Sequence, residues 1–282
     1  MTDQPEIILS PLDPHLAFSK WVVVGASVQG TRHIQMSLPC QDSHAYKVVN
    51  RTTIVAAIAD GLGSAVSSQV GSQLAAAGAV AYVDQELSKA VPLDEASWIQ
   101  LVRDSFISAR NRIEEDAQKN QAALRDYSTT LILAILTDDW LVTGHIGDGA
   151  VVASLEDADT DHPSADKDHP CLVLISLPQN DEYVNVTYPL TMPDMANFAQ
   201  FKARRAKVKA LALLSDGLQH VSIRTADNAP HEPFFEPLFR QLPGVKDMRK
   251  ASQNLAEFLA SERISSHTDD DKTLILIGRQ RA

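Results

Sequence analysis

The amino-acid sequence predicts an α+β fold in which antiparallel strands are layered between helices. Strand-like segments follow one another in the middle of the chain, and helical segments are gathered early and late. Regular alternation of strand and helix would favour a parallel, doubly wound sheet, and the sequence has no such alternation. With 282 residues, 44% of them hydrophobic, the chain has enough material for one large domain or two small ones, and we expect one.

The first elements follow from the positions of proline and valine. Prolines interrupt residues 1–19, which are therefore expected to form a flexible N-terminal lead-in. The domain itself should span 20–282. Its first strand is predicted over 21–27, where consecutive valines favour extended backbone.

A hairpin is expected next, with residues 46–49 paired to 53–56 across a short turn centred on Arg51. Residues equally far from the centre of such a turn lie opposite one another in an antiparallel pair. Asp42 and Asp60 are equally far from Arg51. The register therefore makes neighbours of two carboxylates that are remote in the sequence.

Apolar residues at helical spacing predict three helices. The first covers 64–87, with Ser64 as its N-cap, and the second covers 94–120 behind a proline. The third lies around 248–259.

Most of the remaining chain is strand-like. Three strands in succession predict a meander that is interrupted at Gly147-Asp148-Gly149, and an acidic loop over 156–168 follows them. The expected strands are 131–136, 140–146, 151–155, 172–177, 183–190, 207–214 and 273–277.

Composition excludes several classes of function. A formal net charge of -11 argues against a nucleic-acid backbone as the partner, because that binding needs a basic surface. No apolar run approaches the roughly 20 residues that cross a bilayer, and the N-terminus lacks the pattern of a signal peptide, so we expect a cytoplasmic protein without membrane contact. Cys40 and Cys171 are too few for a disulfide framework or a cysteine-rich zinc site.

Five aspartates stand at the ends of apolar strands, and this pattern predicts a metal site. Carboxylates that converge beside a hydrophobic core must be neutralised, and divalent cations do this well. Magnesium and manganese prefer oxygen ligands, whereas zinc would call for more histidine or cysteine. The five residues are Asp42, Asp60, Asp148, Asp216 and Asp270.

The motifs around these aspartates resemble, in their order, the metal-dependent protein phosphatase 2C family in its compact bacterial form. They are QDS at 41–43, ADGLGS at 59–64, STT at 128–130, GDG at 147–149, SDG at 215–217 and DDKT at 270–273. The resemblance spans residues 21–278. It implies an antiparallel β-sandwich flanked by helix pairs that hydrolyses phosphoserine and phosphothreonine by in-line attack of a hydroxide bridging two Mn²⁺ or Mg²⁺ ions.

The resemblance also implies roles for single residues. Asp60 is similar to the bridging carboxylate, and the carbonyl of Gly61 to a ligand of the second ion. Asp216 and Asp270 match ligands of the first ion. Asp148 matches a ligand of the third ion that many bacterial members use.

Two further acidic positions carry weaker implications. Asp42 matches an acidic position that contacts metal-bound water and is counted with Asp60 among the catalytic candidates. Asp269 and Asp271 compete with Asp270 as the ligand, and the family's Asp-Asn-x-Thr spacing selects Asp270.

Three departures from the family concern the substrate phosphate, the leaving group and the third ion. The arginine that often precedes the acidic motif is absent near Ser37, and Arg32 or His33 could replace it. Leu62 stands where some relatives have a histidine proposed as general acid, and His33 is the preferred proton donor here. His220 occupies a position that is often acidic in relatives that bind a third ion.

Alternatives to a phosphoprotein phosphatase remain open at this point. The same fold could serve as a non-enzymatic phosphopeptide binder or sensor, or could hydrolyse small phosphoesters. The basic run 202–209 could anchor an acidic phosphoprotein or form an exposed strand face, and 230–239 could be a docking surface or core. Expected partners are phosphorylated proteins and a cognate serine/threonine kinase.

Overall fold

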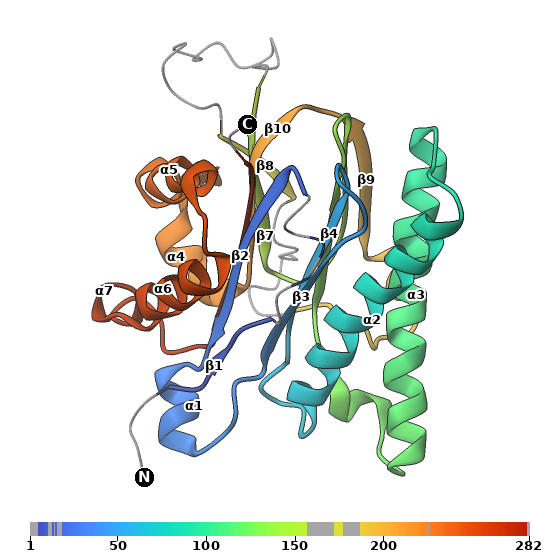
Figure 1. Cartoon of the computed structure of the whole chain (residues 1–282). Helices are drawn as coiled ribbons and strands as arrows, with labels where there is room; N and C mark the ends of the chain where they lie inside the picture. Colours follow the sequence, from blue (N-terminus) through green and yellow to red (C-terminus); the bar gives the residue numbers. More distant parts are fainter. Residues whose placement is uncertain are drawn as a thin grey trace.

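The computed structural model describes residues 5–10, 13, 15, 19–156, 172–176, 187–224 and 226–280. Two large antiparallel sheets pack face to face, and helices cover the outer face of each (Figure 1). The layers are thus helix, sheet, sheet, helix. The predicted α+β fold, an antiparallel β-sandwich flanked by helix pairs, is confirmed.

The first sheet has the strand order β3-β4-β5-β6-β9. β3 and β4 form the predicted hairpin, and its register places Asp42 opposite Asp60 as expected. The five strands are β3 (Asp42–Val48), β4 (Ile54–Asp60), β5 (Leu131–Leu136), β6 (Trp140–Ile146) and β9 (Gln200–Arg205).

The second sheet has the order β1-β2-β13-β10-β7-β8. Its strands are β1 (Ile7–Ile8), β2 (Trp21–Val28), β13 (Lys272–Arg279), β10 (Val208–Leu214), β7 (Ala150–Leu155) and β8 (Leu172–Ser176). A short pair, β11 (Ile223–Arg224) and β12 (Ala229–Pro230), lies apart from both sheets in the pairing.

The expected meander over 131–155 is wrong. β5 and β6 pair in the first sheet, but β7 pairs with β10 and β8 in the second. The chain changes sheets at residues 147–149, where Gly147 has a φ of 114° that L residues rarely adopt. This crossing is what carries Asp148 between the two sheets.

Two long helices cover the first sheet, and shorter ones cover the second (Figure 1). The former are α2 (Ser68–Lys89) and α3 (Glu95–Lys119), with η2 (Leu124–Tyr127) beside them. The latter include α4 (Gln219–Ser222), α5 (Glu232–Gln241), α6 (Met248–Ala260) and α7 (Glu262–Ser265). The other helical turns are α1 (Thr31–Met36), η3 (Met195–Asn197), η4 (Asp216–Leu218) and η5 (Leu242–Gly244). None of the described helices is both long and apolar enough to cross a membrane.

The helix ends confirm one predicted boundary and correct another. Asp94 caps α3, since its Oδ1 accepts the Ser97 N–H at 2.8 Å. Ser64 is not the N-cap of α2, because the chain before Ser68 is held against the 126–128 segment: Leu62 N–H donates to Ser128 O and Ser67 N–H to Asp126 O. The predicted helix began at residue 64, four residues before the observed start at Ser68, because helix propensity does not depend on such long-range hydrogen bonds.

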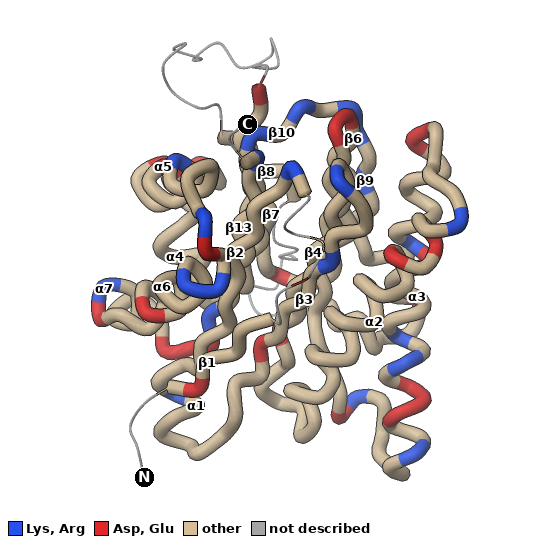
Figure 2. The backbone as a smooth tube through the Cα atoms, viewed as in Figure 1, with Lys and Arg blue, Asp and Glu red and all other residues tan. Residues whose placement is uncertain are grey.

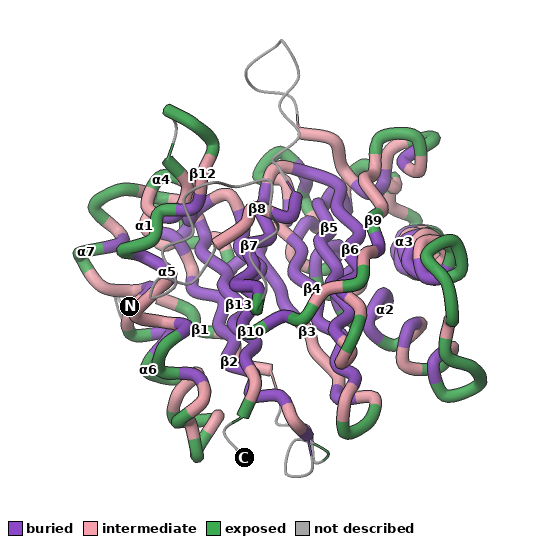
Figure 3. Tube along the Cα trace, turned by 90° about the horizontal axis from the view of Figure 1, so that it is seen from above, coloured by how far each residue is buried: buried purple, intermediate pink, exposed green. Residues whose placement is uncertain are grey.

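The central strands of the first sheet, β4, β5 and β6, are buried on both faces, and β4 shows the consequence of two-residue periodicity. Val55, Ala57 and Ala59 pack toward α2 and α3, while Ile54 and Ile58 pack toward the second sheet. A third apolar layer lies between the second sheet and the α5–α6 helices. Figure 3 shows the buried strands at the centre and exposed residues on the outer faces of the helices.

The expected N-terminal lead-in and the strand expected over 183–190 both differ from the observed structure. β1 pairs with β2, and the Glu6 N–H donates to Gln29 Oε1 at 2.8 Å, so this part of the expected lead-in contacts the second sheet. Of the strand expected over 183–190, residues 183–186 lie outside the described residues. The described remainder is not a strand, and Leu190 N–H donates to Thr129 O instead. Residues 157–168 of the expected acidic loop and Cys171 also lie outside the described residues.

Candidate metal and phosphate site

Three of the predicted aspartates meet where the two sheets end. One carboxylate oxygen each from Asp60, Asp148 and Asp216 lies within 4.8 Å of the others. Asp60 ends β4 in the first sheet, and Asp216 follows β10 in the second. Asp148 belongs to the crossing between β6 and β7. Residues separated by up to 156 positions are thus gathered because antiparallel strands from both sheets terminate at the same edge.

The backbone of Asp60 is fixed by the STT motif. Its N–H donates to Thr130 Oγ1 at 2.9 Å, and its carbonyl accepts from Thr130 N–H at 2.8 Å and from Thr129 Oγ1 at 2.9 Å. These bonds leave the carboxylate free to point into the site. A Cβ on the next residue, Gly61, would lie 2.8 Å from Gln41 O, so only glycine allows the backbone to pass here.

The remaining aspartates have fewer partners for their side chains. Asp148 Oδ2 accepts from Thr187 Oγ1 at 2.5 Å. Asp42 Oδ2 accepts from Ser215 Oγ at 2.8 Å. Within the described part of the chain, Asp42 Oδ1 and Asp216 Oδ1 are buried without a hydrogen-bond partner. Buried acceptors of this kind cost stability unless a cation or a donor reaches them.

Electrostatics among these carboxylates is unfavourable in the metal-free protein. Burial, followed by the charge of Asp148, raises the pKa of Asp216 to about 6. Burial and the neighbouring charges of Asp42 and Asp216 raise the pKa of Asp60 well above its usual value, and burial also raises that of Asp148. Desolvated carboxyls of like charge resist ionisation together.

The nearest cationic side chains do not neutralise the three clustered aspartates. Arg32 Nη2 lies 3.1 Å from Asp270 Oδ2. Lys272 is buried, and its Nζ donates to the carbonyl of Asp270. In the described chain neither forms an ion pair with Asp60, Asp148 or Asp216. An all-oxygen cluster with raised pKa values and unpartnered buried oxygens fits hard divalent cations.

A cavity of about 130 Å³ opens at the cluster. Its lining includes Asp270, outside the tight group of three, and the predicted phosphate contacts Arg32 and His33. Asp42 lies behind the cavity and does not line it. The lining residues are Arg32, His33, Gln41, Asp60, Gly61, Leu62, Gly63, Thr130, Asp148, Thr187, Asp216 and Asp270.

Comparison with known proteins identifies the family. A family model described as "Protein phosphatase 2C" matches residues 29–260. The chain belongs to the protein phosphatase 2C family. The phosphatase is 30% identical over 263 residues to "Serine/threonine-protein phosphatase 3" of Escherichia coli (strain K12), covering 91% of this chain and 97% of that one.

Solved structures share the fold. The serine-threonine phosphatase 2C from Toxoplasma gondii matches with a TM-score of 0.64 at 14% identity, over 98% of this chain and 100% of that one. The catalytic domain of the phosphatase PstP, solved in complex with 2 manganese ions, matches with a TM-score of 0.55 at 18% identity, over 93% of this chain and 99% of that one. At these identities the likeness concerns the fold alone.

The three consecutive acids at 269–271 have different surroundings in this phosphatase. Asp269 is exposed, and Asp270 lines the cavity. Asp271 is buried and does not line the cavity; it contacts His33, Gln41 and Gly30. The sequence motif indicated Asp270 as the ligand candidate. It gave no role to Asp271, because the partners of Asp271 lie at residues 30–41, far away in the sequence.

Other sequence candidates lie away from the cluster. His220 does not line the cavity at the aspartates and faces a larger, mainly apolar cavity of about 560 Å³ under α5 and α6. Phe234, Phe235 and Phe239 are buried in the core, as the core interpretation of 230–239 predicted. Cys40 is fully buried, and burial raises the pKa of its thiol, which disfavours a reactive thiolate.

The basic run lies mainly at the opposite end of the sheets. Arg205 and Lys207 flank the turn between β9 and β10, whereas Asp216 follows the other end of β10. Seven strand residues separate these ends, about 20 Å of extended chain. Figure 2 shows the basic residues of this turn at that end. Contact with a substrate phosphate at the cavity is therefore not expected from this turn.

Proposed function

We propose that Asp60, Asp148, Asp216 and Asp270, with the carbonyl of Gly61, hold the divalent cations of this phosphatase. Membership of the protein phosphatase 2C family makes the chain a metal-dependent serine/threonine protein phosphatase. The observation that carries the assignment to this site is the convergence of three carboxylates within 4.8 Å, with no ion pair to a cationic side chain among the described residues.

The cations that we propose are Mn²⁺ or Mg²⁺, two of them, with a third at Asp148. Oxygen-only donors suit both metals, and the likeness in fold to a structure with 2 manganese ions supports the pair. When bound, such cations offset charge on phosphoryl oxygens and lower the pKa of a water molecule.

The residues of the chain supply binding and orientation. Arg32 lies at the rim of the cavity and is half-exposed, so its guanidinium is free to turn from Asp270 toward a phosphoryl group. Asp42 lies behind the cluster, and its Oδ1 offers an acceptor for an ordered water. The cavity of about 130 Å³ has room for a phosphoryl group, which leaves the peptide on the surface.

The substrates that we propose are proteins phosphorylated on serine or threonine. A serine/threonine kinase that modifies the same proteins would then be a functional partner. The cytoplasmic location and the span of a single domain over 20–282 stay predictions.

The test is phosphate release from phosphoserine, phosphothreonine and phosphotyrosine peptides with manganese, magnesium or a chelator. Wild type should release phosphate from the first two and lose this activity with chelator. Asp60→Asn and Asp216→Asn should each lose about 1000-fold, which corresponds to about 4 kcal/mol of transition-state stabilisation. Asp139→Asn is a matched control, because Asp139 is exposed in the β5–β6 turn at the other end of the sheet.

Three outcomes distinguish the alternatives. Full activity in both Asp60→Asn and Asp216→Asn would refute the site. Tight binding of phosphopeptides without release would indicate a sensor. Release from small phosphoesters with no competition from phosphopeptides would indicate a small-molecule phosphoesterase.

A further inference from the structure

His33 and Asp271 form a buried pair beside the cavity. His33 Nδ1 lies 2.9 Å from Asp271 Oδ2, and the two side chains are only 5% and 3% exposed. We propose that Asp271 is a positioning residue: it orients the His33 ring so that Nε2 donates a proton to the serine or threonine oxygen that leaves phosphorus. This inference rests on the proposed phosphoester hydrolysis at the aspartate cluster.

Asp271 is itself held rigidly. Its Oδ1 accepts the Gly30 N–H at 2.6 Å, and its Oδ2 accepts the Gln41 N–H at 2.6 Å. These two amides come from the segments on either side of His33 in the sequence. The two backbone amides hydrogen-bond this carboxylate, and His33 Nδ1 lies at ion-pair distance from it, in a place where an isolated charge would be costly.

Helix α1 is fastened to the same strand end. The Arg32 N–H donates to Asp269 O at 3.0 Å, and the Arg32 side chain reaches Asp270. Consecutive residues of α1 therefore contact the consecutive acids that precede β13. The position of His33 relative to the cavity is set by several contacts rather than by its own rotamer alone.

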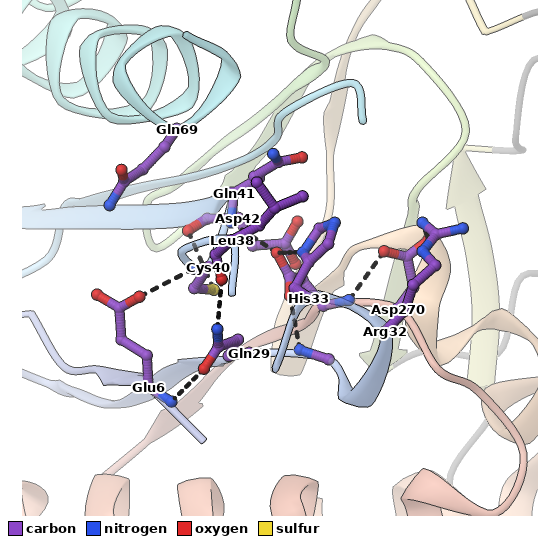
Figure 4. A network of polar contacts seen from close by, with 12 residues as sticks. Glu6, Gln29, Arg32, His33, Leu38, Cys40, Gln41, Asp42, Gln69 and Asp270 are labelled. Atoms are coloured by element: carbon purple, nitrogen blue, oxygen red, sulfur yellow. Dashed lines mark hydrogen bonds and ion pairs between the residues drawn. The ribbon is translucent and has the colours of Figure 1, made fainter. Parts of the chain in front are cut away.

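The direction of the ring follows from this contact. Because Nδ1 faces Asp271, Nε2 is the nitrogen that remains for a substrate, and His33 lines the cavity together with Arg32 and Asp270 (Figure 4). Leu62, which also lines the cavity, has no proton to donate. His33 is the only histidine that lines this cavity in the described chain.

The proposed step balances without an added reactant. A water oxygen forms the new bond to phosphorus, and the bond between phosphorus and the seryl or threonyl oxygen breaks with its electron pair on that oxygen. The proton on His33 Nε2 passes to the same oxygen, which leaves a free hydroxyl. His33 keeps its Nδ1 proton toward Asp271 and regains the other from solvent. General acid catalysis of this kind contributes about 100- to 10,000-fold.

The experiment compares two leaving groups at saturating Mn²⁺. A seryl oxygen is a poor leaving group without a proton, whereas p-nitrophenolate is a good one. His33→Asn and Asp271→Asn should each lower kcat on a phosphoserine peptide about 100-fold. The loss in kcat on p-nitrophenyl phosphate should be at least ten times smaller. Asp269→Asn, the exposed neighbour with the same change of charge, should leave the ratio of the two rates as in wild type.

A double variant separates positioning from a structural role. If Asp271 acts through His33, adding Asp271→Asn to His33→Asn should cause no further loss on the phosphoserine peptide. Additional loss of tenfold or more would overturn the positioning role. If Asp271→Asn unfolds in thermal melting, the leaving-group dependence of His33→Asn alone decides whether His33 is the donor.

The outcome also distinguishes this inference from the proposed site. Equal losses of His33→Asn on both substrates would overturn proton donation while Asp60→Asn remained inactive on both. Wild-type rates for Asp60→Asn would instead refute the metal site on which the inference depends.

Discussion

The two ends of the β-sandwich treat acidic residues in opposite ways. At the β5–β6 turn, Asp138 is paired with Lys20 at 2.7 Å and with Arg279 at 3.2 Å. At the other end, Asp60, Asp148 and Asp216 cluster within 4.8 Å and have no ion pair with a lysine or arginine in the described chain. The protein neutralises one strand-end acid with its own cationic side chains and leaves the clustered acids without such partners among the described residues.

The two groups of acids differ in how well water solvates their charges. The side chain of Asp138 is 36% exposed, so water already stabilises its charge and the ion pairs add little. The clustered carboxylates have raised pKa values because burial removes their hydration. Buried carboxylates that repel one another are the ones whose unfavourable charge energy a bound cation would reduce most.

The largest expected effect is on stability when Mn²⁺ is added to metal-free protein. At a concentration of about 100 times Kd, binding to one site should stabilise the wild type by about 2.7 kcal/mol. Asp216→Asn should lose most of this gain. Without metal the variant should be more stable than wild type by about 1 to 3 kcal/mol at neutral pH, because it removes a buried charge near Asp60 and Asp148. Denaturant unfolding with and without Mn²⁺ measures both quantities.

Asp138→Asn is the matched control at the opposite end and should keep the full gain from Mn²⁺. If Asp216→Asn and wild type gained equally, the contrast between the two ends would not reflect metal binding.

A smaller effect concerns two buried histidines on strands between the ends, His44 and His145, which we expect to be uncharged at neutral pH. Burial lowers the pKa of His145 on β6 to about 3 and that of His44 on β3 to about 4, from 6.5. The unfolded chain therefore binds more protons below this value, and stability should fall as pH decreases from 6.5. His145 alone should account for a loss of about 2 kcal/mol at about pH 5.

His145→Gln should reduce the fall in the free energy of unfolding as the pH decreases. The part of this fall that is due to His44 should remain. Urea unfolding between about pH 5 and 7 gives the slope, which does not depend on the baseline stability of the variant. An unchanged slope in His145→Gln would show that His145 binds protons equally in the folded and unfolded states over this pH range.

The smallest effect is expected at the paired end. Asp138→Asn should destabilise the protein by about 0.5 to 1 kcal/mol, since Lys20 and Asp138 are well exposed. Added salt should reduce the difference from wild type, because it screens exposed charges. The kcat on a phosphoserine peptide should stay at the wild-type value; a large drop in kcat would contradict the separation of the two ends.

Local rules were sufficient for much of the architecture. The symmetric turn around Arg51 predicted that Asp42 opposes Asp60, and apolar spacing behind Pro92 predicted α3. They were insufficient where both faces of a strand are buried. β6 and β7 are buried along almost their whole length and neither alternates strictly between polar and apolar residues, so no pattern indicates that the chain changes sheets between them.

In the candidate site, too, local motifs predicted some residues and missed others. Strand-end aspartates and their motifs were visible in the sequence because each depends on a short segment with its own turn chemistry. The partners of Asp148 and Asp271 were not, since Thr187 and His33 reach them from distant segments. Local spacing cannot register such contacts.

The amino-acid sequence by itself determined which residues end the strands, where the long α3 helix begins, and that the chain carries the acidic motifs of a phosphatase family. Only the tertiary structure decided that Asp60, Asp148 and Asp216 share one place, that Arg32 pairs with Asp270, and that Asp271 turns inward to His33. The reason is physical: backbone preferences act over a few residues, whereas the juxtaposition of charges depends on how two sheets pack, and packing is a property of the whole chain.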